Sequence, residues 1–448
     1  MSDLAISLVE SLFGVLQGEL RLGGILVSAL AKQYGTPCFV YDRSVMDRKL
    51  DALRAALPPR FMVCYSAKAN PNSAVLRHFL SRGCGLEIAS SGEFCQAIEA
   101  GCPPERTLFA GPGKTEAELE FVLSRNVGEI HVESLTEASR IDSISRRLGV
   151  RAKVAIRVNP IGEAEGGAMR MGGRSAPFGV DEEILEQVLD VLLAYPSLEF
   201  RGIHLFTGTQ ILDSATLVSQ YRHGLKVARR IARRVGRPLH TVDFGGGLGI
   251  PYFAHESELD LARLREGLAE LFTTVETEPF FAGTQFLVEP GRFLVGEAGV
   301  YLARVNDIKI SRGKKFLIVD GGMNHHLAAS GNLGQTIKRN YPVALVNKLD
   351  MPAEEKVDVV GPLCTPLDTL ARDISLPRAA IGDLFGIFQS GAYARSASPL
   401  GFLGHPPPPE IWVDDGRHLS IRARGEFSDA LRDPSVECTM TQKERMAF

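Results

Sequence analysis

One segment determines the fold: Phe61-Met62-Val63-Cys64-Tyr65-Ser66-Ala67-Lys68-Ala69-Asn70. It begins with an apolar run, and a lysine, Lys68, follows shortly after this run. A short, continuous apolar run is typical of a strand that is covered on both faces, as in a parallel sheet. Desolvation where such a strand stops lowers the pKa of an amine, which would make Lys68 a competent Schiff-base nucleophile. The ordinary alternative is a solvated lysine at a strand end, so the rest of the chain decides between the two.

The same kind of run recurs along the next part of the chain. The runs are Met62–Ser66, Gly85–Ala89, Thr107–Ala110, Glu129–Glu133, Lys153–Val158, Phe200–Phe206, Thr241–Phe244 and Gln285–Glu289. Between them lie segments of helical period, such as Glu116–Leu123, where Thr115 and Glu118 predict a capping box. Strands that alternate with helices indicate parallel βαβ units. Their number is that of a (β/α)8 TIM barrel.

Beyond Arg292 the pattern becomes rich in β-strands. The runs there are Val300–Val305, Lys315–Val319, Lys356–Val360, Leu384–Phe388 and Glu410–Val413. We therefore expect an α/β protein in which a (β/α)8 barrel over residues 42–292 is joined to a C-terminal, mostly antiparallel β domain. Residues 1–41 and 293–424 are expected to form this second domain, a β-sandwich or β-barrel. Residues 425–448 are expected to be a polar tail.

Composition excludes several classes of function. The 448 residues carry a net charge of −3, which argues against nucleic acid or an anionic membrane as a partner. No apolar segment approaches the roughly 20 residues of a membrane span, and the N-terminus lacks the pattern of a signal peptide. The 7 cysteines have no paired spacing, which is typical of free thiols in a reducing cytoplasm. No Cys/His spacing predicts a metal site, and His325-His326 is a poor chelate by itself.

Polar residues gather at the ends of the expected barrel strands, where TIM barrels bind their ligands. They are Lys68, Glu87, Arg157, His204, Phe206, Thr209, Gly245–Gly249, Glu289, Gly291 and Arg292. The triple glycine lets successive backbone N–H groups converge on a phosphate. Gly113-Lys114-Thr115, by contrast, is interpreted as an ordinary strand–helix turn, because Leu108 stands where a P-loop needs its first glycine.

A lysine, a phosphate cradle and a carboxylate on three strand ends predict pyridoxal phosphate as the cofactor. Lys68 would form the Schiff base, and Glu289 would pair with the pyridine nitrogen and so favour the protonated, electron-accepting ring. Arg292 and Thr209 could add charge and a hydroxyl donor at the phosphate. Phe206 shares a strand face with His204, so it either packs on the cofactor ring or fills the barrel core.

Several motifs, in order, resemble the group IV pyridoxal-phosphate decarboxylases, the family of diaminopimelate, ornithine and arginine decarboxylases with an alanine-racemase-type fold. The matching motifs are Tyr65–Asn70, Glu87–Glu93, Gly202–Gln210, Gly245–Gly249, Glu289–Arg292, Val319–Met323, Gly361–Asp368 and Gly391–Tyr393. The resemblance implies a phosphate site of Gly246, Gly247, Thr209, Arg292 and Tyr393. Glu87, Arg157, His204, Phe206 and Gly291 are expected to complete the cofactor site.

The resemblance further implies that Cys364 is catalytic. In this family the cysteine enters the active site from the second subunit and protonates the substrate carbanion after CO2 leaves. A shared site implies a homodimer. Without the resemblance, Cys364 would be interpreted as a small buried hydrophobe. Asp368, Thr365, His325 and His405 are expected to contact the substrate, although loop polarity or core hydrogen bonding remains an alternative for the two histidines.

Departures from the family pattern bear on the substrate. Phe206 replaces a histidine that usually stacks on the cofactor, and Thr365 replaces the acidic residue of diaminopimelate decarboxylases. Residues 325–331 lack the arginine and tyrosine that grip a distal carboxylate and ammonium, and the segment 402–406 replaces an asparagine-rich stretch. Missing partners would leave polar groups of the substrate unpaired, which argues against free diaminopimelate.

These changes resemble a narrower subgroup that includes decarboxylases of carrier-linked glutamyl units and enzymes of exosortase loci. The leading hypothesis is α-decarboxylation of an amino acid or amino-acid conjugate, free or bound to a carrier protein, in the cytoplasm. A decarboxylase of diaminopimelate or another basic amino acid is the first alternative. A racemase, or a non-catalytic protein that binds the cofactor, is less favoured because Glu289 and Cys364 suit carbanion chemistry.

Overall fold

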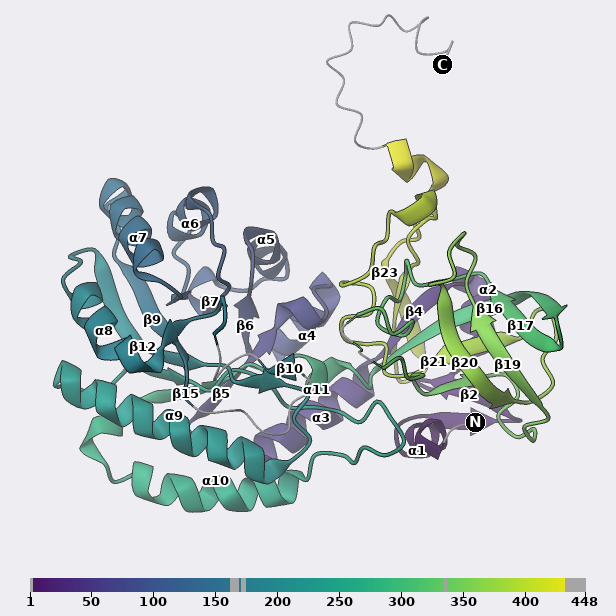
Figure 1. The fold of residues 1–448 in the computed structure, drawn as a ribbon, viewed down its shortest axis with the longest axis horizontal. Helices are drawn as coiled ribbons and strands as arrows, with labels where there is room; N and C mark the ends of the chain where they lie inside the picture. The colour runs from purple at the N-terminus through teal and green to yellow at the C-terminus, as the bar shows by residue number, and fades with distance from the viewer. Residues whose placement is uncertain (1–2, 162–168, 171–174, 334, 336, 432–448) are drawn as a thin grey trace, which may run out of the picture.

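A computed structural model describes residues 3–161, 169–170, 175–333, 335 and 337–431 (Figure 1). Of the expected tail, residues 432–448 lie outside the described part of the chain. Figure 1 shows a barrel surrounded by helices on one side and a β-rich domain on the other. Among the described residues, no helix combines the length and apolar character that a membrane span requires.

The barrel is a closed ring of parallel strands. Its strands are β5 (Phe61–Ser66), β6 (Gly85–Ile88), β7 (Thr107–Phe109), β8 (Glu129–Val132), β9 (Ala152–Asn159), β12 (Leu198–Leu205), β14 (Thr241–Asp243) and β15 (Gln285–Val288). They pair in the order β9-β12-β14-β15-β5-β6-β7-β8, and β8 pairs with β9 to close the ring. Every expected run overlaps one of these strands, so the predicted (β/α)8 barrel is confirmed.

Helices connect the strands along the outside of the barrel (Figure 1). They are α3 (Arg43–Ala56), α4 (Ser73–Ser81), α5 (Ser91–Glu99), α6 (Glu116–Leu123), α7 (Leu135–Leu148), α8 (Leu185–Leu193), α9 (Ser214–Val235), α10 (Leu261–Val275) and the short α11 (Arg292–Val295). The longest, α9, buries Leu217, Tyr221 and Leu225, a four-residue spacing that places one apolar stripe against the barrel. Thr115 and Glu118 form the predicted capping box at the start of α6.

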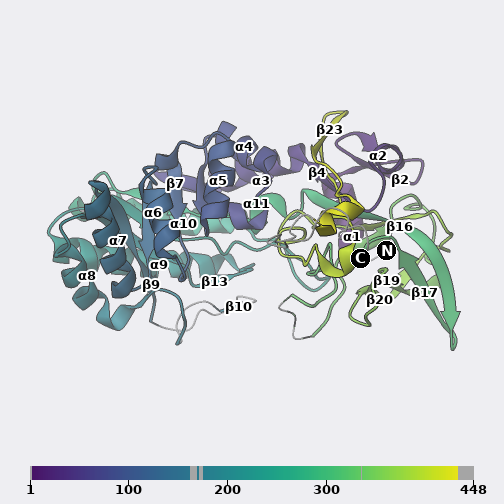
Figure 2. The same cartoon turned by 90° about the horizontal axis from the view of Figure 1, so that it is seen from above.

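The second domain is mostly antiparallel. Its strands are β4 (Cys38–Asp42), β16 (Gly299–Ser311), β17 (Lys314–Val319), β18 (Val343–Leu345), β19 (Glu355–Val360), β20 (Thr369–Leu376), β21 (Leu384–Ile387), β22 (Glu410–Asp414) and β23 (Arg417–Arg422). The long β16 pairs antiparallel with β4, β17 and β21, whereas the pairs β17–β19 and β22–β4 are parallel. Figure 2 shows the β16–β17 hairpin extending away from the barrel.

N-terminal elements pack on this second domain. They are α1 (Asp3–Leu12), β1 (Gly14–Leu16), β2 (Glu19–Leu22), β3 (Ile25–Leu26) and α2 (Val27–Tyr34). Leu20 donates its backbone N–H to the carbonyl of Val346 at 2.8 Å, and apolar side chains of α1 and α2 share a buried cluster with β16 and β22. The expected division of the chain after residues 41 and 292 stays a prediction.

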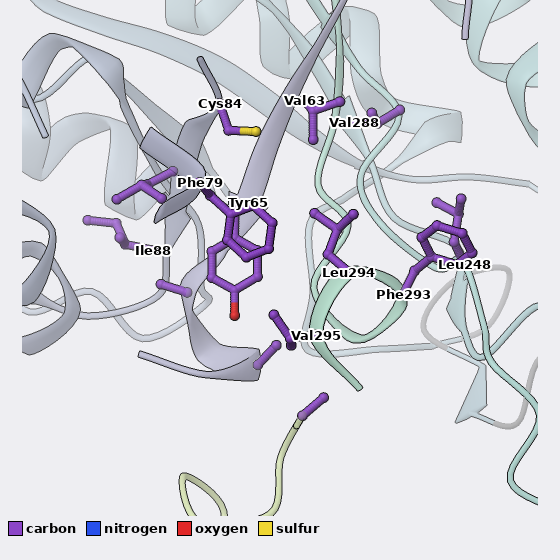
Figure 3. Close-up of a cluster of buried hydrophobic side chains, with 14 of the residues drawn as sticks. Val63, Tyr65, Phe79, Cys84, Ile88, Leu248, Val288, Phe293, Leu294 and Val295 are labelled. Atoms are coloured by element: carbon purple, nitrogen blue, oxygen red, sulfur yellow. The ribbon is translucent and has the colours of Figure 1, made fainter. Parts of the chain in front are cut away.

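The barrel side of the core surrounds β5 and β15 (Figure 3). The ring of Tyr65 stacks on that of Phe79 from α4, with centroids 4.3 Å apart. Val63 lies opposite Val288 across the β5–β15 pair, so both strands are covered by apolar side chains. This burial explains why the run Met62–Tyr65 of β5 and the run Phe286–Val288 of β15 are apolar until the strands end.

Candidate active site

A cavity of about 240 Å³ opens at the carboxyl ends of the barrel strands. Its lining includes Ser66, Lys68, Glu87, Ala89, Ala110, Gly111, Pro112, Arg157, Phe178, His204, Phe206, Thr209, Gly246, Gly247, Leu248, Glu289, Gly291, Arg292 and Tyr393. All of the residues expected in the cofactor site therefore face one space. This convergence arises because parallel strands end at the same rim of the barrel.

Lys68 is paired with a carboxylate in this cavity. Its Nζ donates to both oxygens of Glu87 at 2.9 Å, and Glu87 is itself fully buried at the end of β6. Burial lowers the pKa of Lys68, but the charge of Glu87, with smaller effects of Tyr393 and Glu289, outweighs it and raises the pKa above its usual value. The expected depression of this pKa is therefore wrong, because a neighbouring strand supplies a carboxylate that stabilises the ammonium form.

Glu289 follows β15 and is nearly buried. Its backbone N–H donates to the carbonyl of Gly245 at 2.7 Å, and its Oε2 lies 3.3 Å from His204 Nε2. Burial favours the neutral acid, but His204, His131 and Lys68 outweigh it and hold the pKa of Glu289 below its usual range. Its Oε1 is buried and lies 4.0 Å from His131 Nδ1. Glu289 therefore lines the cavity as an ionised carboxylate.

The glycine turn after β14 is too tight for larger residues. A Cβ on Gly246 would lie 2.5 Å from the carbonyl oxygen of Glu289. Gly247 has a φ of +102°, and a Cβ there would lie 2.8 Å from the carbonyl oxygen of Gly208. Gly208 belongs to β13 (Gly208–Thr209), so a side chain on Gly247 would collide with this strand. Thr209, the last residue of β13, lines the cavity. The backbone N–H groups can approach a ligand here only because both residues lack a Cβ.

A half-buried guanidinium lines the same cavity as this turn. Arg292 donates from Nη1 to the hydroxyl of Tyr252 at 2.9 Å and lies over the ring of Tyr393 at 4.8 Å. Its Nε has no hydrogen-bond partner among the described residues. Tyr393 comes from the second domain and donates its backbone N–H to the carbonyl of Ala69 at 2.8 Å, next to Lys68. The second domain thus completes the anion-binding end of the cavity.

Arg157 closes another wall. Its Nη1 donates to Glu133 Oε1 at 2.8 Å, and its guanidinium lies 4.9 Å from the ring centre of Phe178. Glu133 also accepts the backbone N–H groups of Gly111 and Gly179. One carboxylate therefore holds three walls of the cavity together.

Five of the expected site residues lie elsewhere in this chain, in the second domain. Cys364 is exposed in the loop between β19 and β20, with Thr365 next to it. Asp368 is buried, and its two oxygens accept the backbone N–H groups of Met323 and Leu363 at 2.6 and 2.8 Å. His325 is buried with Nδ1 3.2 Å from the hydroxyl of Tyr301, and His405 is half-buried. None of the five lines the cavity of its own chain among the described residues.

Sequence reasoning missed several residues around the cavity. Tyr252 and Phe178 lie in loops beyond the strand ends, so strand periodicity carries no signal for them. Strand β8 was expected, but its polar residues were not assigned to the site, although Glu129, His131 and Glu133 alternate along this run and all three are buried. Polar residues at every second position of a buried strand face one side of the sheet, which would have marked this strand as part of the site.

The residues present fit pyridoxal phosphate. The cavity brings together an amine on Lys68, a glycine turn that a Cβ would block, and the guanidinium of Arg292. It is also lined by the carboxylate of Glu289, whose pKa is held below its usual range, which suits a ring nitrogen that carries a proton.

Comparisons with known proteins agree with this geometry. Residues 43–296 match the family described as pyridoxal-dependent decarboxylase, pyridoxal binding domain. The chain is 36% identical over 406 residues to the L-glutamyl-[BtrI acyl-carrier protein] decarboxylase of Niallia circulans, covering 90% of this chain and 94% of the relative. It is 34% identical over 433 residues to the diaminopimelate decarboxylase of Methanothermobacter thermautotrophicus, covering 95% and 98% of the two chains.

Solved structures share the whole fold. The diaminopimelate decarboxylase of M. jannaschii, in complex with L-lysine, superposes with a TM-score of 0.85 at 25% identity, covering 94% of this chain and 97% of that one. The expected family, fold class and cofactor are therefore confirmed. This chain belongs to the family of pyridoxal-dependent decarboxylases, lyases that use pyridoxal phosphate.

Proposed function

We propose that this decarboxylase removes the α-carboxylate of an amino-acid conjugate, with a glutamyl unit on an acyl-carrier protein as the leading candidate. The assignment as a decarboxylase rests on one observation, which is that Lys68, Glu289 and the glycine turn line one cavity. The choice of substrate rests on the similarity to the Niallia circulans enzyme and on the residues expected to contact the substrate.

Lys68 is the residue that binds the cofactor covalently. It must first lose a proton, and Glu87 lies within hydrogen-bond distance to accept it. Glu289 holds the ring nitrogen as its ionised partner, and His204 at 3.3 Å keeps that carboxylate oriented. When bound, pyridoxal phosphate accepts the electron pair released as the Cα–carboxylate bond breaks.

The backbone of Gly246 and Gly247, with Thr209, Gly291, Arg292 and Tyr393, would hold the phosphate. The turn would supply N–H donors, and the half-buried Arg292 guanidinium would supply a full positive charge. Phe206 and Arg157 form the walls beside the ring.

Cys364 protonates the substrate carbon after CO2 has left, and it does so in the cavity of the partner subunit. The residue is exposed and remote from the cavity of its own chain, which suits a donor in trans. The functional unit is therefore a homodimer with shared active sites. Asp368 acts through the loop that carries Cys364, since both of its oxygens are used by backbone N–H groups.

A conjugated substrate explains why residues 325–331 lack the arginine and tyrosine that grip the distal end of diaminopimelate. His326 Nε2 lies 2.9 Å from Ser390 Oγ, and His325 pairs with Tyr301, so both imidazoles bond within the second domain. Both imidazoles are also buried, so neither is exposed to grip a distal ammonium or carboxylate. A glutamyl unit joined to a carrier has no distal pair that needs such a grip. Thr365 and His405 remain the candidates for contact with the substrate.

Free diaminopimelate is the second candidate, because the diaminopimelate decarboxylase of Methanothermobacter thermautotrophicus is 34% identical over 95% of this chain. The two are separated by measuring CO2 release from diaminopimelate, ornithine, lysine, arginine, glutamate and a carrier-linked glutamyl unit. Lys68→Ala serves as the blank, and Lys32→Ala, which changes an exposed lysine of α2, is the matched control.

Release from the carrier-linked unit that exceeds release from every free amino acid is the expected result. Comparable release from diaminopimelate overturns the substrate half of the proposal. Equal release by Lys68→Ala and the unchanged protein overturns the role of Lys68.

A further inference from the structure

The chain around Lys68 is attached to the second domain, although Lys68 itself belongs to the barrel. The hydroxyl of Ser396 lies 3.3 Å from the carbonyl oxygens of both Lys68 and Ala69. The backbone N–H of Tyr393 donates to the same carbonyl of Ala69 at 2.8 Å. One loop of the second domain therefore bonds the 3-10 turn η1 (Ala67–Ala69) that carries the nucleophile.

Two buried asparagines continue this attachment beyond the turn. Asn70 donates from Nδ2 to the carbonyl of Gly391 at 3.2 Å, and its Oδ1 accepts the backbone N–H of Asn72 at 3.2 Å. The carbonyl of Asn70 accepts the hydroxyl of Tyr65, the β5 residue labelled in Figure 3, at 3.1 Å. Asn72 Oδ1 accepts the backbone N–H of Ala74 at 3.0 Å and so caps α4. The backbone between η1 and α4 is therefore held from both domains.

Glu410 of β22 binds the amide nitrogen of the second asparagine. Its Oε2 accepts Asn72 Nδ2 at 2.9 Å, and its Oε1 accepts the hydroxyl of Tyr41 at 2.8 Å. Arg422 of the neighbouring β23 forms an ion pair with the same Oε2. Glu410 and Asn72 are each 2% exposed, so water does not replace either partner when their hydrogen bond is broken.

We propose that Glu410 is a positioning residue that fixes, through Asn72, the loop after Lys68 and with it the place of the Lys68 amine. Within the described part of the chain, Glu410 does not line the cofactor cavity, so its effect reaches Lys68 only through this loop. The amine must lie close to the cofactor aldehyde before it can add to it with loss of water, so a displaced loop slows covalent capture. This inference rests on the proposed role of Lys68.

Covalent capture and simple binding can be measured separately. Stopped-flow absorbance at saturating pyridoxal phosphate gives the rate constant of capture by the full chain freed of cofactor. Pyridoxine 5′-phosphate carries an alcohol in place of the aldehyde, so it binds without reacting with Lys68, and its affinity reports whether the cavity is intact. General damage to the fold lowers both quantities, whereas displacement of Lys68 slows capture alone.

Two substitutions break the hydrogen bond from opposite sides. Asn72→Ser keeps an oxygen that can cap α4 but removes the donor to Glu410. It is expected to slow capture by about tenfold or more, while the affinity for pyridoxine 5′-phosphate stays within about threefold. Glu410→Ala removes the acceptor and is expected to do the same. Because both substitutions break one hydrogen bond, the double variant should capture the cofactor within about threefold of the slower single variant.

A conservative variant and a matched control complete the set. In Glu410→Gln the amide oxygen can still accept from Asn72, and the amide nitrogen can donate to the Tyr41 hydroxyl, so capture is expected to stay within about threefold of the unchanged protein. Asp383 is also buried in the second domain, where it pairs with Lys348 at 2.6 Å away from this loop. Asp383→Ala is expected to leave the rate of capture unchanged.

Three results would overturn the inference. They are an unchanged rate of capture in Asn72→Ser, equal losses of capture and of pyridoxine 5′-phosphate affinity, and a loss in the double variant that multiplies the two single losses. If Asn72→Ser or Glu410→Ala does not fold, Tyr41→Phe provides the test, because it removes only the hydroxyl that donates to Glu410. Capture by Tyr41→Phe is expected to slow by about threefold or more, and an unchanged rate would likewise refute the positioning role.

Lys68→Ala separates this inference from the function on which it rests. Capture by Lys68→Ala at the unchanged rate would refute the role of Lys68 itself. Loss of capture in Lys68→Ala, together with normal capture in Asn72→Ser, would refute only the positioning role of Glu410.

Discussion

The amine of Lys68 lies 2.9 Å from each oxygen of Glu87, so the nucleophile of the site and a buried carboxylate form one ion pair. The pair keeps Lys68 protonated, because the charge of Glu87 stabilises the ammonium form more than partial desolvation destabilises it. Covalent capture of the cofactor therefore requires transfer of a proton away from the lysine.

Glu87→Gln is expected to make the covalent capture of pyridoxal phosphate less dependent on high pH. Loss of the carboxylate charge lowers the pKa of Lys68, so the pH at which capture is half-maximal moves down by about one unit or more. Stopped-flow absorbance at a series of pH values measures this midpoint. The control is Glu93→Gln, which changes a nearby half-buried acid that accepts the backbone N–H of Ala89 instead. An unchanged midpoint in Glu87→Gln would contradict the prediction.

Gly246→Ala is expected to weaken the binding of pyridoxal phosphate about tenfold or more. The added Cβ would lie 2.5 Å from the carbonyl oxygen of Glu289, and such overpacking costs about 1–3 kcal/mol. Fluorescence titration measures the affinity, and pyridoxal without its phosphate should lose less. At Gly113 a Cβ would meet nothing within 4 Å, so Gly113→Ala is the matched control. Equal losses at the two glycines would speak against a phosphate cradle.

Mixing two inactive variants is expected to restore activity if the sites are shared. Lys68→Ala and Cys364→Ala damage different components of each site, so a hybrid dimer retains one site with both residues intact. Random exchange of subunits then gives about a quarter of the unchanged activity, measured as CO2 release. Remixing Lys68→Ala with itself is the control. No recovery after verified subunit exchange would place both residues in the same chain's site.

Asp368→Ala is expected to lower the rate of decarboxylation while leaving cofactor affinity unchanged. The substitution leaves the backbone N–H groups of Met323 and Leu363 without acceptors, at a cost of about 1–3 kcal/mol for each buried group. The loop that carries Cys364 loses its anchor, whereas the cofactor cavity is distant from it. CO2 release measures the rate, and cofactor titration measures the affinity of the same variant. A loss of cofactor affinity that parallels the loss of rate would contradict the prediction.

The protein is expected to lose stability as the pH falls below about 6.5, in part through His326. Burial lowers the pKa of His326 to about 3, so below the ordinary histidine pKa the unfolded chain binds a proton that the folded chain does not. The free energy of unfolding then decreases with falling pH, by at most about 2 kcal/mol for this group at about pH 5. His326→Gln should reduce the difference between melting temperatures at about pH 7.5 and 5. His255→Gln, at an exposed histidine, should not. An undiminished difference in His326→Gln would refute the assignment.

Part of the fold and of the candidate site could be predicted from the sequence. The barrel strands, the capping box of α6 and the convergence of Lys68, Glu289 and the glycine turn all follow from local patterns, and the structure has them. Asp368 was expected to face substrate, but the structure turns it toward backbone N–H groups of two loops. Contacts between segments far apart in the chain leave no periodic signal, so they could not be foreseen.

By itself, the sequence determined that strands alternate with helices and which side chains stand at the strand ends, because both depend on the periodicity of neighbouring residues. Only the tertiary structure decided the charge of those side chains. Lys68 is paired because β6 lies beside β5, and His131 meets three carboxylates because β8, β14 and β15 face one barrel interior. The pKa of a buried group depends on charges within a few ångströms, whichever part of the chain supplies them.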